Sequence, residues 1–201
     1  MKLHTDPLEP ETYYHIYNRG INKENIFKED RNYSFFLERY TKFIAPVAET
    51  YSYCLLKNHF HVLIRTRSEG EIRMAFPLKE KLETGRIISM QFSHLFNSYA
   101  QAVNKSFKRT GGLFETPFRR IAVRDAAYRI GLMRYIHLNP GKHGFTDDFK
   151  TYPWSSYLSY RNAGSDTVER EAGLAWFGGE KDFIKYHETP DSGEDIFGDL
   201  M

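Results

Sequence analysis

The apolar residues of the chain recur at two different spacings, which predicts a mixture of strands and helices. Four short segments are rich in aromatic and β-branched residues, as strands are. Lys57-Asn58 separates the second segment from the third, a spacing typical of a tight hairpin. The strands are expected at residues 13–19, 51–56, 60–66 and 119–123.

Three other segments place apolar residues on one face of a helix. The first follows Asp30, a candidate N-cap, and the second covers residues 90–105. The third begins after Asp125 and is expected to end before Pro140, because a residue that precedes proline disfavours helical geometry. Residues 68–88 are charged and are expected to form a loop or a short helical excursion.

The resulting order is β-α-β-β-α-β followed by a helix, which predicts an α+β fold of the ferredoxin-like, split βαβ type. Its antiparallel sheet would carry helices on one face and leave the other face open for a ligand. Nucleases and RNA-binding proteins share this fold, so the fold alone does not decide the function. We expect residues 1–146 to form the domain and residues 147–201 to form an acidic C-terminal extension, with one helix near residues 181–187.

The composition of the 201 residues narrows the class of protein. Hydrophobic residues make up 41% and charged residues 27%, which provides for a core and argues against global disorder. No apolar run approaches the length of a membrane span, and the N-terminus is too polar for a signal peptide. The single cysteine, Cys54, excludes an internal disulfide framework and a Cys-rich zinc site. We therefore expect a soluble, cytoplasmic protein with no membrane partner.

The net charge of +2 conceals an asymmetry along the chain. Residues 147–201 carry five basic and twelve acidic side chains, whereas residues 1–146 carry 23 basic and 14 acidic ones. Eight basic side chains lie within residues 103–134, against two acidic ones. Such a block suits a polyanion, although a solvated basic face would have the same composition. The candidates for phosphate contacts are Lys105, Lys108, Arg109, Arg119, Arg120 and Arg124.

Two histidines stand at the start of the third predicted strand. His59 and His61 flank Phe60, and they share one face because side chains alternate across a strand. The alternation assigns Phe60 to the core, so we expect both imidazoles on the open face. Two imidazoles in these positions can bind one divalent ion, although paired structural histidines are the commoner arrangement.

The third predicted helix carries a second candidate pair. Tyr135 and Asn139 are four residues apart and therefore project from the same face of the helix. The amide oxygen of Asn139 suits Mg²⁺ or Mn²⁺ better than zinc, and the phenolic oxygen of Tyr135 can attack phosphorus. A tyrosine at the edge of the core and an asparagine that caps the helix would explain the same residues.

Taken together, these motifs resemble a known family. KNHFHVLI resembles the His-hydrophobic-His motif of the HUH endonuclease superfamily, and RYIHLNP resembles the nucleophile helix of its single-tyrosine transposases. GGLFETPFRR and YPWSSY resemble the branch called REP-associated tyrosine transposases, so that the resemblance covers roughly residues 13–160. It implies that His59, His61 and Asn139 hold Mg²⁺ or Mn²⁺ and that Tyr135 is the nucleophile. Insertion-sequence relatives often carry glutamine at the position of Asn139, and this departure favours the REP-associated branch.

The resemblance further implies cleavage and rejoining of single-stranded DNA, at sites that contain hairpins, through a 5′-phosphotyrosine. Two other functions fit the same residues: a catalytically silent module that binds single-stranded nucleic acid, and a metal-dependent hydrolase in which Tyr135 takes no part. The sequence leaves open whether the chain forms a homodimer. Of the remaining candidates, Tyr99 is expected to pack in the core, His137 is expected to have a structural or a surface role, and His15 is expected to lie near the site.

Overall fold

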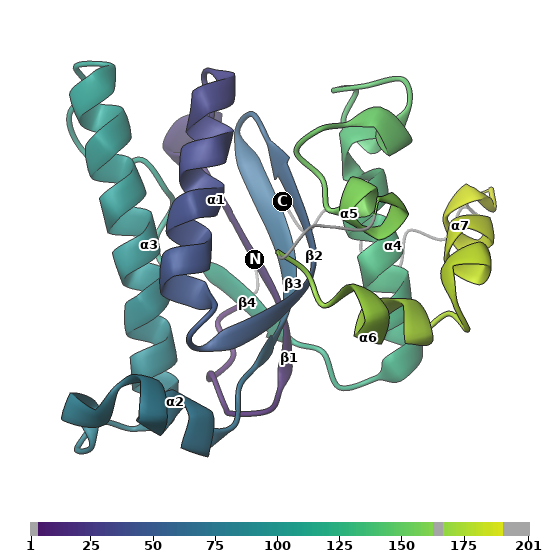
Figure 1. The fold of residues 1–201 in the computed structure, drawn as a ribbon. Coiled ribbons are helices and arrows are strands. Elements are labelled where there is room, and N and C mark those ends of the chain that lie inside the picture. Colours follow the sequence, from purple (N-terminus) through teal and green to yellow (C-terminus); the bar gives the residue numbers. More distant parts are fainter. Residues whose placement is uncertain (1–3, 163–166, 191–201) are drawn as a thin grey trace.

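The computed structural model describes residues 4–162 and 167–190 and contains a four-stranded antiparallel sheet (Figure 1). The strand order β2-β3-β1-β4 is that of the ferredoxin-like fold, so the α+β prediction is confirmed. A two-residue turn at Lys57-Asn58 joins β2 to β3, as the hairpin pattern predicts. The strands are β1 (Tyr13–Arg19), β2 (Ala48–Leu56), β3 (His59–Thr66) and β4 (Arg119–Ala122).

Two long helices, α1 (Asp30–Ile44) and α3 (Thr84–Ser106), cover one face of the sheet (Figure 1). Phe60 of β3 points to this side, with its ring 5.3 Å from Phe36 of α1 and 5.9 Å from Phe96 of α3. The prediction that Phe60 of β3 faces the core is therefore confirmed. Tyr99 is fully buried there and donates a hydrogen bond to the Ile26 carbonyl at 2.7 Å, so its structural role is confirmed.

The opposite face of the sheet is covered, so the expectation of an open face is wrong. Helix α4 (Ala126–Lys142) packs against β2 and β3, and α5 (Tyr157–Arg161) lies beside it (Figure 1). The apolar stripe of α4, with Leu132, Met133 and Ile136 fully buried, explains this packing. Candidate site residues on this face therefore lie beneath a helix rather than in solvent.

Several helix ends differ from the sequence expectation. Helix α1 is capped by Glu29, whose side chain pairs reciprocally with Asn32 in a capping box, rather than by Asp30. Helix α4 begins at the predicted cap, since Asp125 accepts a hydrogen bond from the Tyr128 backbone at 2.6 Å, but it continues past Pro140. Proline removes one backbone donor, and the last turn still closes through the His143 amide and the Asn139 carbonyl.

The charged stretch before the second long helix is largely helical. It contains α2 (Glu69–Ala75) and a short 3₁₀ turn (Pro77–Lys79), and α3 begins six residues earlier than residue 90. A capping box between Ser68 and Glu71 starts α2. A further 3₁₀ turn, Ile21–Lys23, lies between β1 and α1.

The described part of the C-terminal segment packs on α4 and on the edge strand β2. It contains a 3₁₀ turn (Phe149–Thr151), α5, α6 (Arg170–Ala175) and α7 (Glu180–Glu188), and α7 confirms the helix expected near residues 181–187. The Tyr160 hydroxyl donates to the Tyr51 carbonyl at 2.6 Å, and the Tyr152 hydroxyl donates to the Leu55 carbonyl at 2.8 Å. The acidic stretch 191–201 lies outside the described residues.

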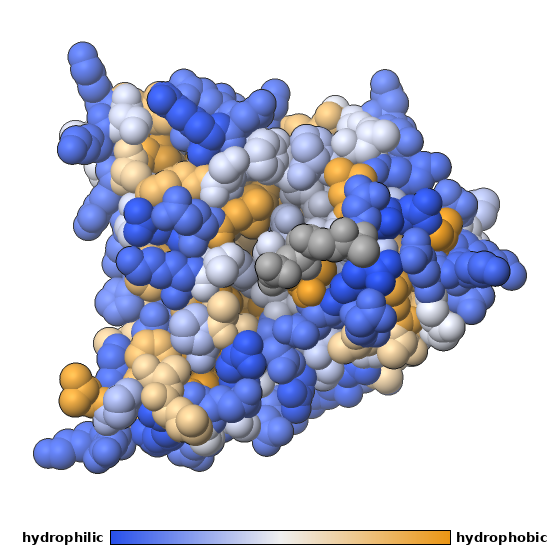
Figure 2. Space-filling view, viewed as in Figure 1, coloured by the Kyte–Doolittle hydropathy of each residue, from blue (hydrophilic) through white to orange (hydrophobic). Residues whose placement is uncertain are grey.

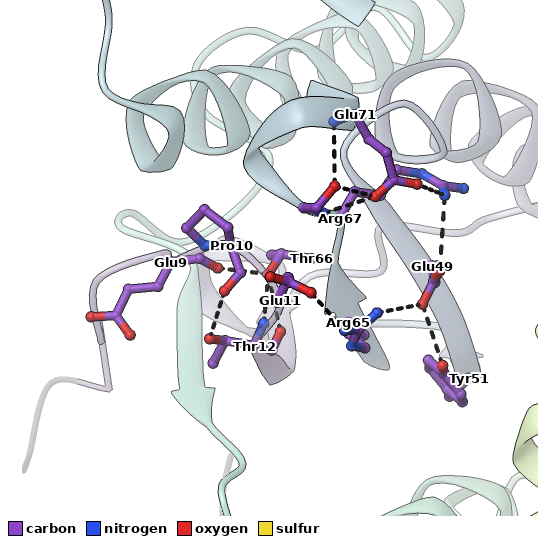
Figure 3. Close-up of polar contacts among 11 residues, drawn as sticks. Glu9, Pro10, Glu11, Thr12, Glu49, Tyr51, Arg65, Thr66, Arg67 and Glu71 are labelled. Atoms are coloured by element: carbon purple, nitrogen blue, oxygen red, sulfur yellow. Dashed lines mark hydrogen bonds and ion pairs between the residues drawn. The ribbon is translucent and has the colours of Figure 1, made fainter. Parts of the chain in front are cut away.

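At the C-terminal end of β3, away from its histidines, charged side chains form ion pairs with neighbouring segments (Figure 3). Arg65 contacts Glu11 at 3.3 Å and Glu49 at 3.5 Å, and the Thr66 hydroxyl donates to the Glu9 carbonyl at 2.6 Å. Arg67 continues the network to Glu71 at 3.3 Å. These contacts hold the segment before β1 against the sheet.

On the face shown in Figure 2, hydrophobic side chains gather in scattered groups between hydrophilic ones. Among residues 4–162 and 167–190, no helix combines the length and the apolar character needed to cross a membrane.

Candidate active site

The two candidate histidines lie on the central strand β3, beneath α4. His59 is 3% exposed and His61 is fully buried, so their predicted exposure on an open face is wrong. In the antiparallel pairing of β1 with β3, Tyr17 stands opposite His61 and Arg19 stands opposite His59. Paired residues of this kind project to the same face, so all four side chains belong to the α4 side of the sheet.

Tyr135 of α4 lies directly over the histidines. Its ring meets that of His61 edge-on at 5.7 Å and that of His15 at 6.5 Å, and Tyr135 is 6% exposed. Asn139 lies one helical turn further along and is fully buried, with its side-chain N–H directed to the Tyr135 carbonyl at 3.3 Å. The structure therefore brings Tyr135, His61 and His59 together, with Asn139 on the same helix face.

Four buried atoms of this cluster lack a hydrogen-bond partner among the described residues: His59 Nε2, His61 Nε2, Asn139 Oδ1 and, on β1, His15 Nδ1. Leaving a buried polar atom unpaired costs about 1–3 kcal/mol, and such atoms are few in native proteins. Two imidazole nitrogens and an amide oxygen are a donor set for a divalent cation. The described residues contain no group of three His, Cys, Asp or Glu side chains suited to a metal, so such a site depends on Asn139.

The tautomer of His59 follows from its neighbour. His59 Nδ1 lies 2.7 Å from Asn58 Oδ1, and because this oxygen can only accept, Nδ1 carries the proton and Nε2 presents a lone pair. His61 Nδ1 lies 2.9 Å from His15 Nε2, and a proton on this Nδ1 leaves His61 Nε2 in the same state. These arrangements are typical of imidazoles that bind a metal ion.

Burial also keeps the imidazoles neutral. It lowers the pKa of His59 to about 3, and His143 contributes in the same direction, while the nearby Asn139 side chain offsets part of the shift. Burial lowers the pKa of His15 to about 3 and the pKa of His61 well below its usual value. At neutral pH all three rings therefore offer lone pairs and no positive charge.

Tyr17 and His15 complete the cluster from β1. The Tyr17 ring stacks on His15 at 4.8 Å and on His61 at 5.6 Å. Burial raises the pKa of Tyr17 to about 12, with Arg119 acting against the shift. The alternation along β1 places His15 and Tyr17 on one face, but it does not show that the same face carries Tyr135, so sequence reasoning left Tyr17 out.

A carboxylate joins two arginines at one side of the cluster. Glu115 Oε1 lies 2.7 Å from Arg19 Nε, and Glu115 Oε2 lies 3.4 Å from a terminal nitrogen of Arg119. Both guanidinium groups are partly exposed and carry further N–H donors. Arg119 stands opposite Tyr17 in the sheet, so this cluster presents two cations beside the tyrosines and the histidines. Arg19 and Glu115 were not singled out from the sequence.

The six predicted DNA-contact residues do not form one patch. Arg119 faces the site, whereas Arg120, the next residue of β4, points to the opposite side and lies over the Phe118 ring at 5.0 Å. Arg124 is exposed and contacts Glu9 at 3.6 Å. Lys105 and Lys108 are exposed near the C-terminal end of α3.

Arg109 and two other arginines of the basic block serve the fold. Arg109 contacts Glu24 at 2.8 Å and donates to the Asn104 side chain at 2.7 Å. The Arg129 guanidinium lies 4.3 Å from the Tyr13 ring centre, and Arg134 Nε donates to the Tyr186 carbonyl at 3.1 Å. The polyanion interpretation therefore rests on the other members of the block.

The structure thus places the His-x-His strand beneath the helix that carries tyrosine and asparagine, so the motifs on which the family resemblance rests lie together. Comparisons with known proteins found similar chains. The chain is 26% identical over 114 residues to a curated protein of Haemophilus influenzae provisionally named a REP-associated tyrosine transposase. The match covers 54% of this chain and 58% of that protein, a little over half of each.

A solved structure has a similar fold. It is described as a REP-associated tyrosine transposase bound to a REP hairpin, and the TM-score is 0.59 at 13% identity. The similarity covers 85% of this chain and 98% of the other. A scan against protein-family profiles finds no match. The resemblance to REP-associated tyrosine transposases, first seen in the motifs, is confirmed by both similar proteins.

Proposed function

We propose that this protein is a metal-dependent transposase that cleaves and rejoins single-stranded DNA at hairpin-containing sites. The main observation is that Tyr135 lies over a buried cluster in which His59 Nε2, His61 Nε2 and Asn139 Oδ1 have no partner among the described residues. The similar curated protein bears a transposase name, and the similar solved structure is bound to a REP hairpin. Both support transposition as the activity and a DNA hairpin as the partner.

His59 Nε2, His61 Nε2 and Asn139 Oδ1 would hold Mg²⁺ or Mn²⁺. When bound, the ion polarises the scissile phosphate and stabilises negative charge on the transferring group. Asn58 holds the proton of His59 on Nδ1, which leaves the His59 Nε2 lone pair for the cation. His61 Nε2 offers its lone pair in the tautomer in which His61 Nδ1 donates to His15 Nε2.

Tyr135 acts as the nucleophile. Its phenolic oxygen forms a bond to the scissile phosphorus, and the bond from that phosphorus to the 3′ oxygen breaks. The leaving 3′ oxygen takes up one proton as Tyr135 gives up one, so the step balances. The products are a 5′-phosphotyrosine and a free 3′-hydroxyl, and the attack of a 3′-hydroxyl on the phosphotyrosine rejoins strands without ATP.

Arg19 and Arg119 bind backbone phosphates beside the reacting group. Glu115 holds both guanidinium groups at the side of the site, and each retains N–H donors that match the oxygens of a phosphate. The two cations thus guide the strand toward Tyr135, while Lys105, Lys108, Arg120 and Arg124 supply contacts further away.

Covalent capture tests the proposal. A hairpin oligonucleotide with single-stranded flanks, labelled downstream of each candidate cleavage point, should form a covalent adduct with the protein in Mg²⁺ or Mn²⁺. Tyr135→Phe removes only the attacking oxygen, so the adduct should disappear while the circular-dichroism spectrum is unchanged. Tyr186→Phe, which removes an exposed hydroxyl, is the control and should keep the adduct.

Three results would contradict parts of the proposal. An undiminished adduct in Tyr135→Phe would exclude this nucleophile. Hairpin binding with no adduct for the unmodified protein would favour the catalytically silent binding module. Cleavage that releases both DNA ends, with no adduct at any time, would favour the metal-dependent hydrolase.

A further inference from the structure

Tyr17 of β1 lies within the cluster beneath α4, and none of the steps proposed for the reaction involves it. It stands opposite His61 of β3 on one side and opposite Arg119 of β4 on the other. Directly paired residues of neighbouring strands project to the same face of a sheet. The Tyr17 side chain therefore lies between a candidate metal ligand and an arginine assigned to the DNA phosphates.

Two imidazoles hold the ring of Tyr17 in place. The ring stacks on His15 with 4.8 Å between the ring centres and 30° between the planes, and on His61 with 5.6 Å and 23°. Because the ring is confined between these partners and α4, the direction of its hydroxyl is set before any ligand binds. A donor fixed in this way needs little reorganisation when charge develops on a reacting group.

The hydroxyl of Tyr17 makes no hydrogen bond to another residue within 4–162 and 167–190. Other buried tyrosines of the chain do use their hydroxyl in a hydrogen bond to the protein, among them Tyr14, Tyr40, Tyr99, Tyr152 and Tyr160. Tyr17 is only 4% exposed, but its oxygen is not sealed from solvent as His59 Nε2 and His61 Nε2 are. A ligand can therefore reach this hydroxyl and supply the acceptor that the protein does not.

The groups around this hydroxyl are those that would surround a reacting phosphate. Burial raises the pKa of Tyr17 to about 12, Arg119 opposes the shift, and Tyr135 and Tyr128 add to it. At neutral pH the phenol is an uncharged O–H donor. An uncharged donor between the Arg119 cation and the proposed nucleophile matches a phosphate oxygen that gains negative charge.

We propose that the Tyr17 hydroxyl donates a hydrogen bond to a non-bridging oxygen of the phosphate that Tyr135 attacks, so that Tyr17 is a second catalytic tyrosine. The proton stays on Tyr17, and no bond to Tyr17 forms or breaks. The hydrogen bond strengthens as negative charge grows on the oxygen, so it accelerates the chemical step more than it tightens DNA binding. The inference rests on the proposed function for the reaction itself.

Tyr17→Phe tests this role, because it removes the hydroxyl and keeps the ring that packs on His15 and His61. Adduct formation under single-turnover conditions in Mn²⁺ should slow by roughly 10-fold to 100-fold, as expected for the loss of one donor to a charged oxygen. The affinities for the hairpin oligonucleotide and for Mn²⁺ should stay within about two-fold. Tyr186→Phe, which removes an exposed hydroxyl, is the control and should keep the rate.

Sulfur substitution in the DNA tests the contact directly. Each non-bridging oxygen of the scissile phosphate is replaced in turn by sulfur, a weaker hydrogen-bond acceptor, and Mn²⁺ is used because it tolerates a sulfur neighbour better than Mg²⁺ does. One of the two diastereomers should slow adduct formation by the unmodified protein by roughly five-fold or more. The same diastereomer should slow Tyr17→Phe by less than about two-fold, since both changes remove the same hydrogen bond.

An unchanged rate in Tyr17→Phe, or equal sulfur effects in the two proteins, would overturn the inference. A slower rate with weaker Mn²⁺ binding and a full sulfur effect would assign Tyr17 to the support of the histidines, and would overturn it as well. If Tyr17→Phe does not fold, the unmodified protein decides: slowing by one diastereomer supports the contact, and slowing by neither overturns it. Absence of any adduct contradicts the proposed function and this inference together, whereas an adduct that forms independently of Tyr17 contradicts the inference alone.

Discussion

Asn58 determines how His59 can act, although it would not itself contact a metal ion. Its side-chain oxygen accepts the Nδ1 proton of His59 at 2.7 Å, and this leaves Nε2 with its lone pair toward the cluster. Partners of this kind fix the orientation and the tautomer of metal-binding histidines. The hairpin turn that joins β2 to β3 therefore also prepares the site.

We expect Asn58→Ala to weaken Mn²⁺ binding by roughly 10-fold to 100-fold, the usual cost of losing a partner of a ligating histidine. Isothermal titration of the protein with Mn²⁺ measures the effect. Lys57→Ala changes the neighbouring, exposed turn residue and should leave Mn²⁺ affinity within about two-fold. Equal losses in both variants would mean that the turn itself, rather than the hydrogen bond, is what matters.

Glu115 is a positioning residue for two arginines. Its carboxylate contacts Arg19 at 2.7 Å and Arg119 at 3.4 Å, and each of these side chains has most of its surface covered. A neutral amide at this position cannot hold both cations, so the two guanidinium groups become free to take other positions.

We expect Glu115→Gln to bind DNA as tightly as the unmodified protein or more tightly, since one negative charge is lost near the phosphates. Adduct formation under single-turnover conditions should nevertheless slow by roughly ten-fold or more, because misplaced phosphate contacts misalign the reacting atoms. Glu80→Gln, an exposed control, should change neither quantity. Weaker binding combined with an unchanged rate would contradict the positioning role.

Alternation along the strands correctly predicted which residues share a face with His59 and His61, but not that this face is buried. The two-residue period of a strand shows which side chains share a face of the sheet. Whether that face is buried depends on where α4, more than 60 residues later in the sequence, packs. For the same reason Tyr17 could be placed beside His15 from the sequence, but not beside Tyr135.

At the scale of elements, α4 is the helix whose position and C-terminal end were predicted least accurately from the sequence. Its amphipathic stripe predicted a helix and its cap, and Asp125 occupies that cap. The stripe did not show which face of the sheet it covers, and Pro140 suggested an end that the helix passes by a few residues. Pro140 removes one backbone donor, but the residues after it still close the last turn through the bond from the His143 amide to the Asn139 carbonyl.

A chain of buried polar groups joins α4 to α7. His137 Nδ1 lies 2.9 Å from His187 Nε2, and His137 Nε2 lies 2.8 Å from the Ser156 hydroxyl. His187 Nδ1 donates to the Phe183 carbonyl at 2.8 Å, so its Nε2 accepts from His137. Of the two roles expected for His137, structural or surface, the structure shows the structural one, and its partners come from the C-terminal segment.

The buried hydrogen-bonded groups His137, His187 and Ser156 predict a loss of folding stability in mild acid. Burial is the main cause that lowers the pKa of His187 to about 4, from an ordinary value of 6.5. The folded state therefore favours neutral His187, and the resulting stability is complete above pH 6.5 and decreases as the pH falls toward 4. By linkage the loss reaches roughly 3 kcal/mol for this group.

Urea unfolding at pH 7 and at pH 5 measures this loss. His187→Gln should be less stable than the unmodified protein at pH 7 but should lose less stability between the two pH values. His94→Gln replaces an exposed histidine and should keep the full dependence on pH. Because other buried histidines also titrate, His187→Gln should reduce the dependence without removing it, and an unchanged dependence would contradict the role assigned to this chain.

At the scale of the whole molecule, charge counts alone overstate the surface available to DNA. The block at residues 103–134 contains arginines that hold the fold together, among them Arg109 and Arg129, beside others that face solvent. A count of charges cannot separate arginines that hold the fold together from those that face solvent. The distinction depends on contact partners such as Glu24 and Trp176, which are far away in the sequence. The fold class and the core of the site followed from local patterns, whereas the use of each cation depends on tertiary contacts.

Lys105 and Arg109 provide a matched test of this distinction, since they are four residues apart and carry the same charge. Lys105 is exposed, whereas Arg109 contacts Glu24, Asn104 and the Gly112 carbonyl. We expect Lys105→Gln to reduce the log–log slope of DNA affinity against salt by about 0.7, the value for one single-strand phosphate contact, with little change in thermal stability. Arg109→Gln should leave the slope nearly unchanged and should lower stability by roughly 1–2 kcal/mol, because it breaks several hydrogen bonds of one turn. Anisotropy titrations from 50 to about 300 mM salt, together with thermal unfolding, measure both quantities. A reduced slope for Arg109→Gln at unchanged stability would mean that Arg109 exchanges its internal partners for DNA, and the basic block would then act as one surface after all.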